Sequence, residues 1–324
     1  ARQERISRMA GAPFWSKYGV PLAFVIVAIV FASLNARFAT SNNALLVLQQ
    51  ASVDAIAALG LTMILVGGGI DLSQGSVMAL SSAVAGGLVA RHGAPEMAAI
   101  GFGLAAGALV GGVNGFFAEH GKVPAFIVTL ATLFVVRGLV NVYLGGEDIV
   151  VPRDRIPILH EIAVGKLGGI PIMVWLCLVL YAVGAFFMRY SRWGLRTYAV
   201  GSSEESSSRA GIRVSRHRMG LYVIAGLLSA VSGLMLLGRL SDAPADLATG
   251  EEFYVITAAV LGGASLFGGK GRVWRSFMGA VFLAMIANGL VLAGVPAFYQ
   301  QVAVGLLLLF ALLLDRFGRD DGRS

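Results

Sequence analysis

The residues of this sequence that could do chemistry are polar side chains set inside long apolar stretches. Most carry amides or hydroxyls; the eight of interest are Gln49, Gln50, Asp54, Asn114, Thr129, Asn288, Gln300 and Gln301. Amides and hydroxyls exchange hydrogen bonds without a fixed charge, which suits contact with a polyhydroxylated solute. Each one taken alone is better explained as a hydrogen bond between two helices. Taken as a set, they favour a polar path through an apolar protein.

A second candidate is the one long polar stretch, residues 189–218, which carries seven arginines. Apolar segments flank it on both sides, so it is expected to be a loop at one end of those segments. Within it, a short helix is expected between Ser203 and Ile212, and it opens on Glu204 and Glu205. A small helix in such a loop has little purpose unless another protein binds it. We therefore interpret this segment as the contact with a motor subunit.

Two glycine-rich breaks interrupt the apolar stretches, GGGIDLSQGS at 67–76 and GGASLFGGKGR at 262–272. Glycine, serine and aspartate end helices and allow tight turns. Asp71 and Ser73 are expected to cap the helix that follows the first break. The second break is not a phosphate-binding loop, because Lys270 is followed by glycine where serine or threonine is required. The sequence therefore predicts no ATP site in this chain.

Composition indicates the class of protein. The chain is 57% hydrophobic and 13% charged, and soluble domains are about 25% charged. The net charge of +7 does not indicate nucleic-acid binding, because the basic residues fall between apolar segments rather than on one face. A single cysteine, Cys177, allows no internal disulfide, and four scattered histidines predict no metal site. No HExxH pair or GxSxG elbow is present, which argues against an intramembrane enzyme.

Apolar runs long enough to cross a bilayer predict an all-α transmembrane bundle of about ten spans. The predicted spans are 18–34, 44–66, 74–90, 97–118, 123–144, 170–188, 219–238, 253–267, 274–293 and 298–314. With the N-terminus inside, the inner segments hold three times as many lysines and arginines as the outer ones. This bias predicts that both termini are cytoplasmic.

The predicted organisation is a basic cytoplasmic tail (1–17), one membrane domain (18–315) and a second cytoplasmic tail (316–324). Most arginines of the loop 189–218, Arg218 among them, are interpreted as anchors at the anionic inner face of the membrane. Arg137 lies within a span and is expected to pair with a carboxylate, for which Asp54 is a candidate.

Glycine is placed where helices are expected to touch. Gly103, Gly107, Gly111 and Gly115 recur at every fourth residue of the fourth span. This spacing puts all four on one face of a helix, where a neighbouring backbone can approach closely. The stripe therefore predicts tight structural packing.

Three segments together resemble the ribose-type permeases of bacterial ATP-binding-cassette (ABC) importers. They read GGGIDLSQGSVMALSSAVAGGL, GGVNGFFAEHGKVPAFIVTLATLFVVRGLV and ANGLVLAGVPAFYQQVAVGLLLL, and the resemblance runs from about Ala44 to Asp315. Within the first segment, the signature residues are Gly69, Asp71, Ser73 and Gly75. Related branched-chain amino-acid permeases more often have asparagine at the position of Asp71. The resemblance therefore implies a monosaccharide, pentose or hexose, or a related polyol as the substrate.

The same resemblance implies a multi-pass subunit of the bacterial cytoplasmic (inner) membrane with several partners. These are two ATPase (nucleotide-binding) subunits, a second permease copy or paralogue, and a periplasmic or lipid-anchored sugar-binding protein. ATP and Mg²⁺ would be held by the ATPase subunits, so no cofactor is expected on this chain. The segment SEESSSRAGI corresponds to the coupling segment that enters a groove of the ATPase, which carries over Glu204, Glu205, Ser206 and Gly211 as coupling residues. Ser206 and Ser207 stand where alanines are usual.

The alternative function is an ion-coupled secondary carrier for a small polar solute. Such carriers usually need an intramembrane carboxylate, and Asp54 could serve. The scarcity of acidic residues in the spans and the coupling-like segment argue against it.

Overall fold

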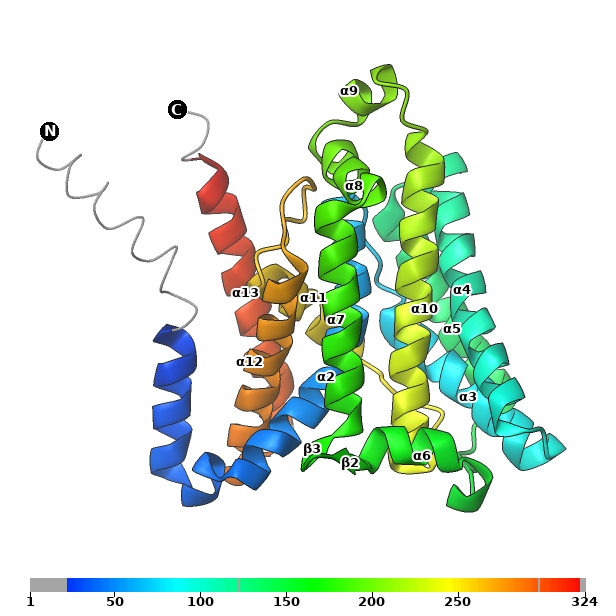
Figure 1. Cartoon of the computed structure of the whole chain (residues 1–324), viewed down its shortest axis with the longest axis vertical. Helices are drawn as coiled ribbons and strands as arrows, with labels where there is room; N and C mark the ends of the chain where they lie inside the picture. The colour runs from blue at the N-terminus through cyan, green and yellow to red at the C-terminus, as the bar shows by residue number, and fades with distance from the viewer. Residues whose placement is uncertain (1–21, 122, 297, 321–324) are drawn as a thin grey trace, which may run out of the picture.

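The computed structural model describes residues 22–121, 123–296 and 298–320. As predicted, these residues are mostly helical (Figure 1). The helices are Leu22–Leu34, α2 (Ser41–Val66), α3 (Gln74–His92), α4 (Glu96–His120), α5 (Ala125–Leu144), α6 (Pro157–Val164), α7 (Ile172–Tyr190), α8 (Arg192–Ser202), α9 (Glu204–Arg209), α10 (Val214–Leu240), α11 (Glu251–Leu261), α12 (Val273–Leu292) and α13 (Phe298–Asp320). The predicted tail 1–17 lies outside the described residues, as do residues 321–324 of the second tail.

Short extended and 3-10 segments complete the chain. Two antiparallel strand pairs join β1 (Ile149–Val150) to β4 (Asp242–Ala243) and β2 (Lys166–Leu167) to β3 (Ile170–Pro171). The 3-10 helices are η1 (Ala36–Ala39) and η2 (Arg153–Arg155). In Figure 1, β2, β3 and α6 lie at one end of the bundle, and α9 projects from the opposite end.

Among the described residues, six helices are long and apolar enough to cross a membrane: α2, α4, α5, α7, α10 and α12. The other four predicted spans fall on the helix Leu22–Leu34, α3, α11 and α13. The predicted span 253–267 is wrong at its end. Helix α11 has 11 residues and stops at Leu261, where Gly262 and Gly263 follow. A helix of 11 residues is about 16 Å long, and the hydrocarbon core of a bilayer is about 30 Å thick.

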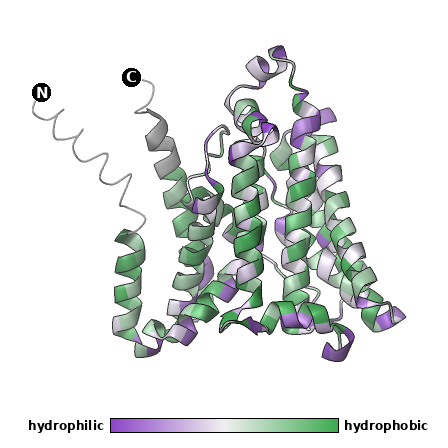
Figure 2. Ribbon diagram, in the orientation of Figure 1, coloured by the Kyte–Doolittle hydropathy of each residue, from purple (hydrophilic) through white to green (hydrophobic). Residues whose placement is uncertain are grey.

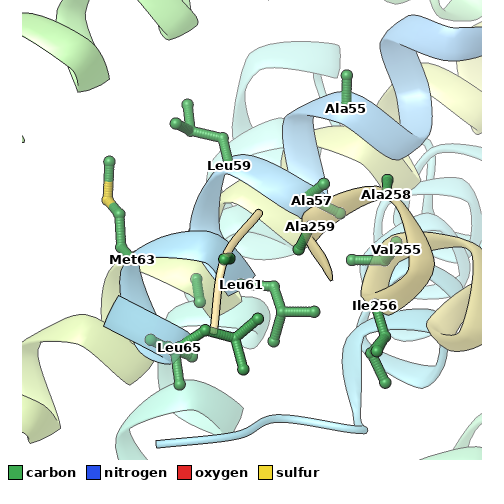
Figure 3. Close-up of a cluster of buried hydrophobic side chains, with 14 of the residues drawn as sticks. Ala55, Ala57, Leu59, Leu61, Met63, Leu65, Val255, Ile256, Ala258 and Ala259 are labelled. Carbon is green, nitrogen blue, oxygen red and sulfur yellow. The ribbon is translucent and has the colours of Figure 1, made fainter. Parts of the chain in front are cut away.

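Helix α10 lies at the centre of the bundle and packs against α2, α3 and α4. Helices α2 and α10 are the most buried of the six candidate spans. Figure 3 shows part of the core, where Ala57 and Leu61 of α2 face Val255 and Ala259 of α11. Alanine is frequent here because small side chains let two helix backbones approach closely.

The glycine stripe of α4 is confirmed as a packing surface, and its partner is α10. A β-carbon added at Gly107 would lie 2.5 Å from both the Gly226 carbonyl oxygen and Ala230 Cβ. One added at Gly115 would lie 2.9 Å from the Met219 Cα. Any side chain at these positions would therefore push α4 and α10 apart.

The outer surface of the bundle is apolar. Figure 2 shows hydrophobic residues along the length of the helices and hydrophilic ones gathered toward the two ends. On α5, exposed side chains include Phe134, Val135, Leu139 and Val142. Apolar residues exposed over several helical turns are suited to lipid rather than water.

Candidate functional site

The loop 189–218 forms two helices, α8 and α9, where a single short helix was expected. Helix α9 begins at Glu204, because the Ser203 hydroxyl accepts a hydrogen bond from the Ser206 N–H at 3.2 Å. It ends at Arg209, and Gly211, two residues further on, has a φ of +82°, a left-handed conformation that glycine adopts without strain. The Gly211 N–H donates to the Ser208 carbonyl at 2.9 Å, which closes the last turn. Both ends of α9 are therefore fixed.

Helix α9 stands clear of the rest of the bundle (Figure 1). The predicted coupling residues Glu204, Glu205, Ser206 and Gly211 are all exposed. Arg209 and Glu205 form an ion pair of 2.6 Å along the helix. The exposed position and the fixed shape suit contact with another protein.

Arg218 lies beneath α9, at the start of α10, and its interpretation as a lipid anchor is wrong. Its side chain is only 15% exposed, and Nη1 lies 2.8 Å from Glu204 Oε2 and 3.7 Å from Glu119 Oε1. Its Nε donates to the Gly67 carbonyl oxygen at 3.0 Å. Arg218 therefore joins α9, α4 and the first glycine-rich break.

The two glycine-rich breaks, far apart in the sequence, meet below this loop. The Gly269 N–H donates to the Val66 carbonyl at 2.9 Å. A β-carbon added at Gly268 would lie 2.6 Å from the Gly201 carbonyl oxygen and 2.9 Å from Gly68 Cα. Backbone from α2, α8 and the α11–α12 connection therefore packs together with no room for side chains.

The signature residues of the first break form a buried polar network at the start of α3. Asp71 accepts hydrogen bonds from the Ser73 N–H (2.8 Å), the Ser73 hydroxyl (2.6 Å) and the Gln74 amide (2.9 Å). Asn114, on α4, donates to the Ser73 hydroxyl at 2.9 Å. The predicted capping of α3 is not observed for either residue: Asp71 bonds Ser73, which precedes the helix, and the Gln74 side chain, and the Ser73 side chain makes no capping bond to α3.

Gly69 and Gly75 leave space for neighbouring helices. A β-carbon at Gly69 would lie 2.8 Å from the Tyr222 hydroxyl, and one at Gly75 would lie 2.5 Å from the Ala248 carbonyl. The four signature residues therefore fix the first break against its neighbours; none of them lines the cavity described next.

A cavity of about 300 Å³ lies between α2, α10, α11, α12 and α13. Its lining residues are Gln50, Val53, Asp54, Leu236, Arg239, Glu251, Tyr254, Ala284, Ala287, Asn288, Val291 and Gln300. The lining comes from the last turns of α10 and α12, so the cavity lies toward the end of the bundle opposite α9.

Four of the eight predicted path residues line this cavity: Gln50, Asp54, Asn288 and Gln300. The other four do not, so their prediction as path residues finds no support in the cavity. Gln49 donates to the Ala163 carbonyl at 2.7 Å, and Thr129 donates to the Ala125 carbonyl of its own helix at 3.0 Å. Asn114 belongs to the Asp71 network, and Gln301 is exposed.

The cavity also contains charged and aromatic side chains that the sequence did not single out. The carboxyl groups of Glu251 and Asp54 are neighbours in this lining, and Arg239 and Tyr254 complete the polar wall. Glu251 lies in the first turn of α11, where acidic residues are common, so its position in the sequence did not indicate a cavity. Carboxyl groups, amides and a phenol around one space can hold a neutral solute by several hydrogen bonds.

The predicted pairing of Arg137 with Asp54 is wrong. Arg137 Nη1 donates to the Leu247 carbonyl at 2.7 Å, and Glu252 and Asp246 are the acidic groups that act on it. Asp54 is instead the partner of Glu251. The cation is satisfied by backbone oxygens of the α10–α11 connection, which no pattern in the sequence places beside α5.

The membrane helices, the polar cavity between them and the projecting α9 define a transport permease. Residues 43–312 match the sequence profile of a family described as branched-chain amino acid transport system / permease component. The chain belongs to this family and is a multi-pass protein of the bacterial cytoplasmic membrane.

Curated relatives cover nearly the whole chain. The ribose import permease protein RbsC of Bacillus subtilis is 37% identical over 300 residues, 93% of this chain and 92% of the relative. The ribose import permease protein RbsC of Escherichia coli K12 is 35% identical over 295 residues, which are 91% of this chain and 92% of the relative. The D-allose transport system permease protein AlsC of Escherichia coli K12 is 32% identical over 306 residues, which are 94% of this chain and 93% of the relative.

Proposed function

We propose that this chain is the membrane subunit of an ATP-driven importer and forms the path for a monosaccharide or a related polyol. The observation that carries the proposal is the cavity lined by Gln50, Asp54, Glu251 and Asn288, which offers hydrogen-bonding groups within an apolar bundle. The relatives support the substrate class, because their names specify ribose and D-allose, both neutral monosaccharides. They do not favour the alternative, an ion-coupled secondary carrier.

The proposed partners are two ATPase subunits, a second permease copy or paralogue, and a periplasmic or lipid-anchored sugar-binding protein. Glu204, Glu205, Ser206 and Gly211 form or end the exposed α9, which supports their role in contacting the ATPase. ATP and Mg²⁺ would be bound by that partner. ATP-driven closure of the ATPase pair would move α9, and the helices around the cavity would then open to opposite sides of the membrane in turn.

The proposed topology has about ten spans with both termini in the cytoplasm and a single membrane domain over residues 18–315. Each predicted span overlaps a helix, and six of these helices are long and apolar enough to cross a membrane, which supports the order of crossings. Helix α9 and five of the seven loop arginines, Arg189, Arg192, Arg196, Arg213 and Arg216, lie between the last turn of α7 and the first turn of α10, at one end of the bundle, which would face the cytoplasm.

The test is to co-express the chain with a candidate ATPase subunit from the same bacterium and to purify the complex in mild detergent. We expect the ATPase to co-purify with the native chain and to be lost when residues 203–212 are scrambled. Scrambling the exposed residues 145–148 at the other end of the bundle is the matched control and should have no effect. An ATPase that stays bound to the chain with the 203–212 scramble contradicts the proposed contact.

The substrate class is tested by uptake into proteoliposomes that contain the complex and its binding protein. Labelled ribose, allose and a branched-chain amino acid are compared with ATP inside the vesicles and with an ionophore present. Uptake of a sugar that needs ATP and resists the ionophore supports the proposal. Uptake abolished by the ionophore in the presence of ATP would establish the secondary carrier instead.

A further inference from the structure

We infer that Arg218 and Tyr198 are positioning residues that transmit the movement of α9 to the helices around the cavity. This inference rests on the proposed coupling to an ATPase. It concerns how a displacement of α9 reaches a cavity that lies toward the opposite end of the bundle.

Arg218 connects α9 to the first glycine-rich break. Its Nη1 donates to Glu204 Oε2 of α9 at 2.8 Å, and its Nε donates to the Gly67 carbonyl at 3.0 Å. Gly67 ends α2, the helix that carries Gln50 and Asp54 into the cavity. A guanidinium holds two acceptors in a fixed relative direction, whereas a lysine ammonium does not. A shift of Glu204 therefore changes the force on the end of α2.

Tyr198 makes the equivalent connection to the second break. Its hydroxyl, on α8, donates to the Gly271 carbonyl at 2.9 Å. Burial raises the pKa of Tyr198, so the phenol keeps the proton that this bond requires. Gly271 lies in the connection between α11 and α12, which carry Glu251, Tyr254 and Asn288 into the cavity.

Direct backbone contact makes the two breaks move together. The Gly269 N–H donates to the Val66 carbonyl at 2.9 Å, and a β-carbon at Gly201 would lie 2.6 Å from the Gly269 nitrogen. Packing this close transmits displacement, because protein interiors have low compressibility. Four cavity-lining helices, α2, α10, α11 and α12, therefore begin or end at one junction below α9.

Glu204 makes this junction responsive to the motor. Its side chain is 62% exposed on the helix proposed to enter the ATPase, while its partner Arg218 is 15% exposed. This ion pair joins a residue at the proposed ATPase interface to a residue inside the bundle, so a movement of one displaces the other.

The test measures the number of sugar molecules transported per ATP hydrolysed by the reconstituted complex of permease, ATPase and binding protein. Arg218→Lys keeps the charge but cannot hold Glu204 and Gly67 together. We expect this ratio to fall by about tenfold, the effect of losing one hydrogen bond to a charged group. Arg216→Lys, at an exposed arginine two residues earlier, is the matched control and should keep the native ratio.

Tyr198→Phe provides a second test if the Arg218 variant fails to assemble. It removes one hydroxyl and keeps the ring, and we expect a ratio about fivefold lower, as for one neutral hydrogen bond. Tyr190→Phe, at an exposed tyrosine, is its control. A native ratio in both Arg218→Lys and Tyr198→Phe, with less complex recovered, would show a purely structural role and overturn the inference. A native complex without ATP-driven uptake would instead refute the proposed function.

Discussion

Glycine residues in α4 act through the space that their missing side chains leave for α10. Gly107 lies against Gly226 and Ala230, while Gly101, two turns earlier on the same helix, has no atom within 4 Å of an added β-carbon. The same residue type on one helix therefore has opposite roles. Gly107 is required by contact, whereas Gly101 only weakens the helix.

Replacement of each by alanine separates the two roles. We expect Gly107→Ala to destabilise the protein by about 1–3 kcal/mol, because the added methyl group overpacks the contact with α10. Gly101→Ala is expected to stabilise it by about 0.5–1 kcal/mol through helix propensity. Thermal unfolding of the purified variants in detergent measures both. A Gly107→Ala variant as stable as Gly101→Ala would disprove the close approach of α4 and α10.

Asp71 is the signature residue whose role the structure explains most directly. It is buried and accepts three hydrogen bonds within its own break, from Ser73 and Gln74. In the sequence, Asp71 is the residue that favours the sugar-transporting branch of the family. Its contacts show that it holds the start of α3, at a distance from the cavity lining.

Asp71→Asn should therefore impair folding and not substrate choice. The asparagine amide would place its NH₂ against the Gln74 NH₂, and Gln74 cannot simply turn because its oxygen bonds to Ser229. We expect a loss of about 1–3 kcal/mol, the cost of an unsatisfied buried group. Asp246→Asn, in the α10–α11 connection, is the control. A variant of normal stability with altered sugar preference in the uptake assay would show that Asp71 acts on the substrate.

At the scale of elements, α9 depends on its two ends more than on its six residues. A helix this short is unstable alone, and here Ser203 closes one end and Gly211 the other. An added β-carbon at Gly211 meets no atom within 4 Å, so its requirement for glycine comes from its φ of +82° alone. Glycine is therefore needed at position 211 for its backbone conformation and not for space. Substitution there disturbs α9 without changing the packing of the core.

Gly211→Val is expected to weaken binding of the ATPase subunit about tenfold, since a left-handed backbone costs a side-chain-bearing residue about 1–2 kcal/mol. Gly145→Val is the matched control, because Gly145 has φ +78° and equally open surroundings at the end of α5. Both variants carry the same backbone strain, but only the first lies beside α9. Affinity is measured by titrating the ATPase onto immobilised permease. Equal affinity for the two variants would exclude α9 as the binding element.

The sequence predicted the helices better than the connections, for a physical reason. Continuous apolar runs indicate spans because the bilayer requires them, and α2, α4 and α10 follow directly. Helix α8 was not predicted, because only a narrow stripe of its residues is buried. These residues are Gly194, Thr197 and Val200, and they alternate with exposed arginines. That three-residue spacing was the available signal.

At the scale of the whole molecule, the cavity could be predicted only in part. Four of its polar residues, Gln50, Asp54, Asn288 and Gln300, stand out in apolar helices, and the sequence indicated them as path residues. Glu251 and Arg239 lie at helix ends, where charge is unremarkable in a sequence, and only tertiary packing turns them toward Asp54. The meeting of the two breaks also depends on backbone contacts between Val66 and Gly269, which no local pattern encodes.

The proposed orientation is the last prediction, and the lone cysteine makes it easy to test. Cys177 is buried, so a membrane-impermeant maleimide should leave the native protein unlabelled in intact cells. Glu147→Cys and Ser208→Cys place exposed thiols at opposite ends of the bundle. With the arginine-rich loop in the cytoplasm, we expect Glu147→Cys to be labelled in intact cells and Ser208→Cys only after permeabilisation. The reverse pattern would invert the topology and place α9 out of reach of any cytoplasmic ATPase. Labelling of both in intact cells would contradict a membrane position between them.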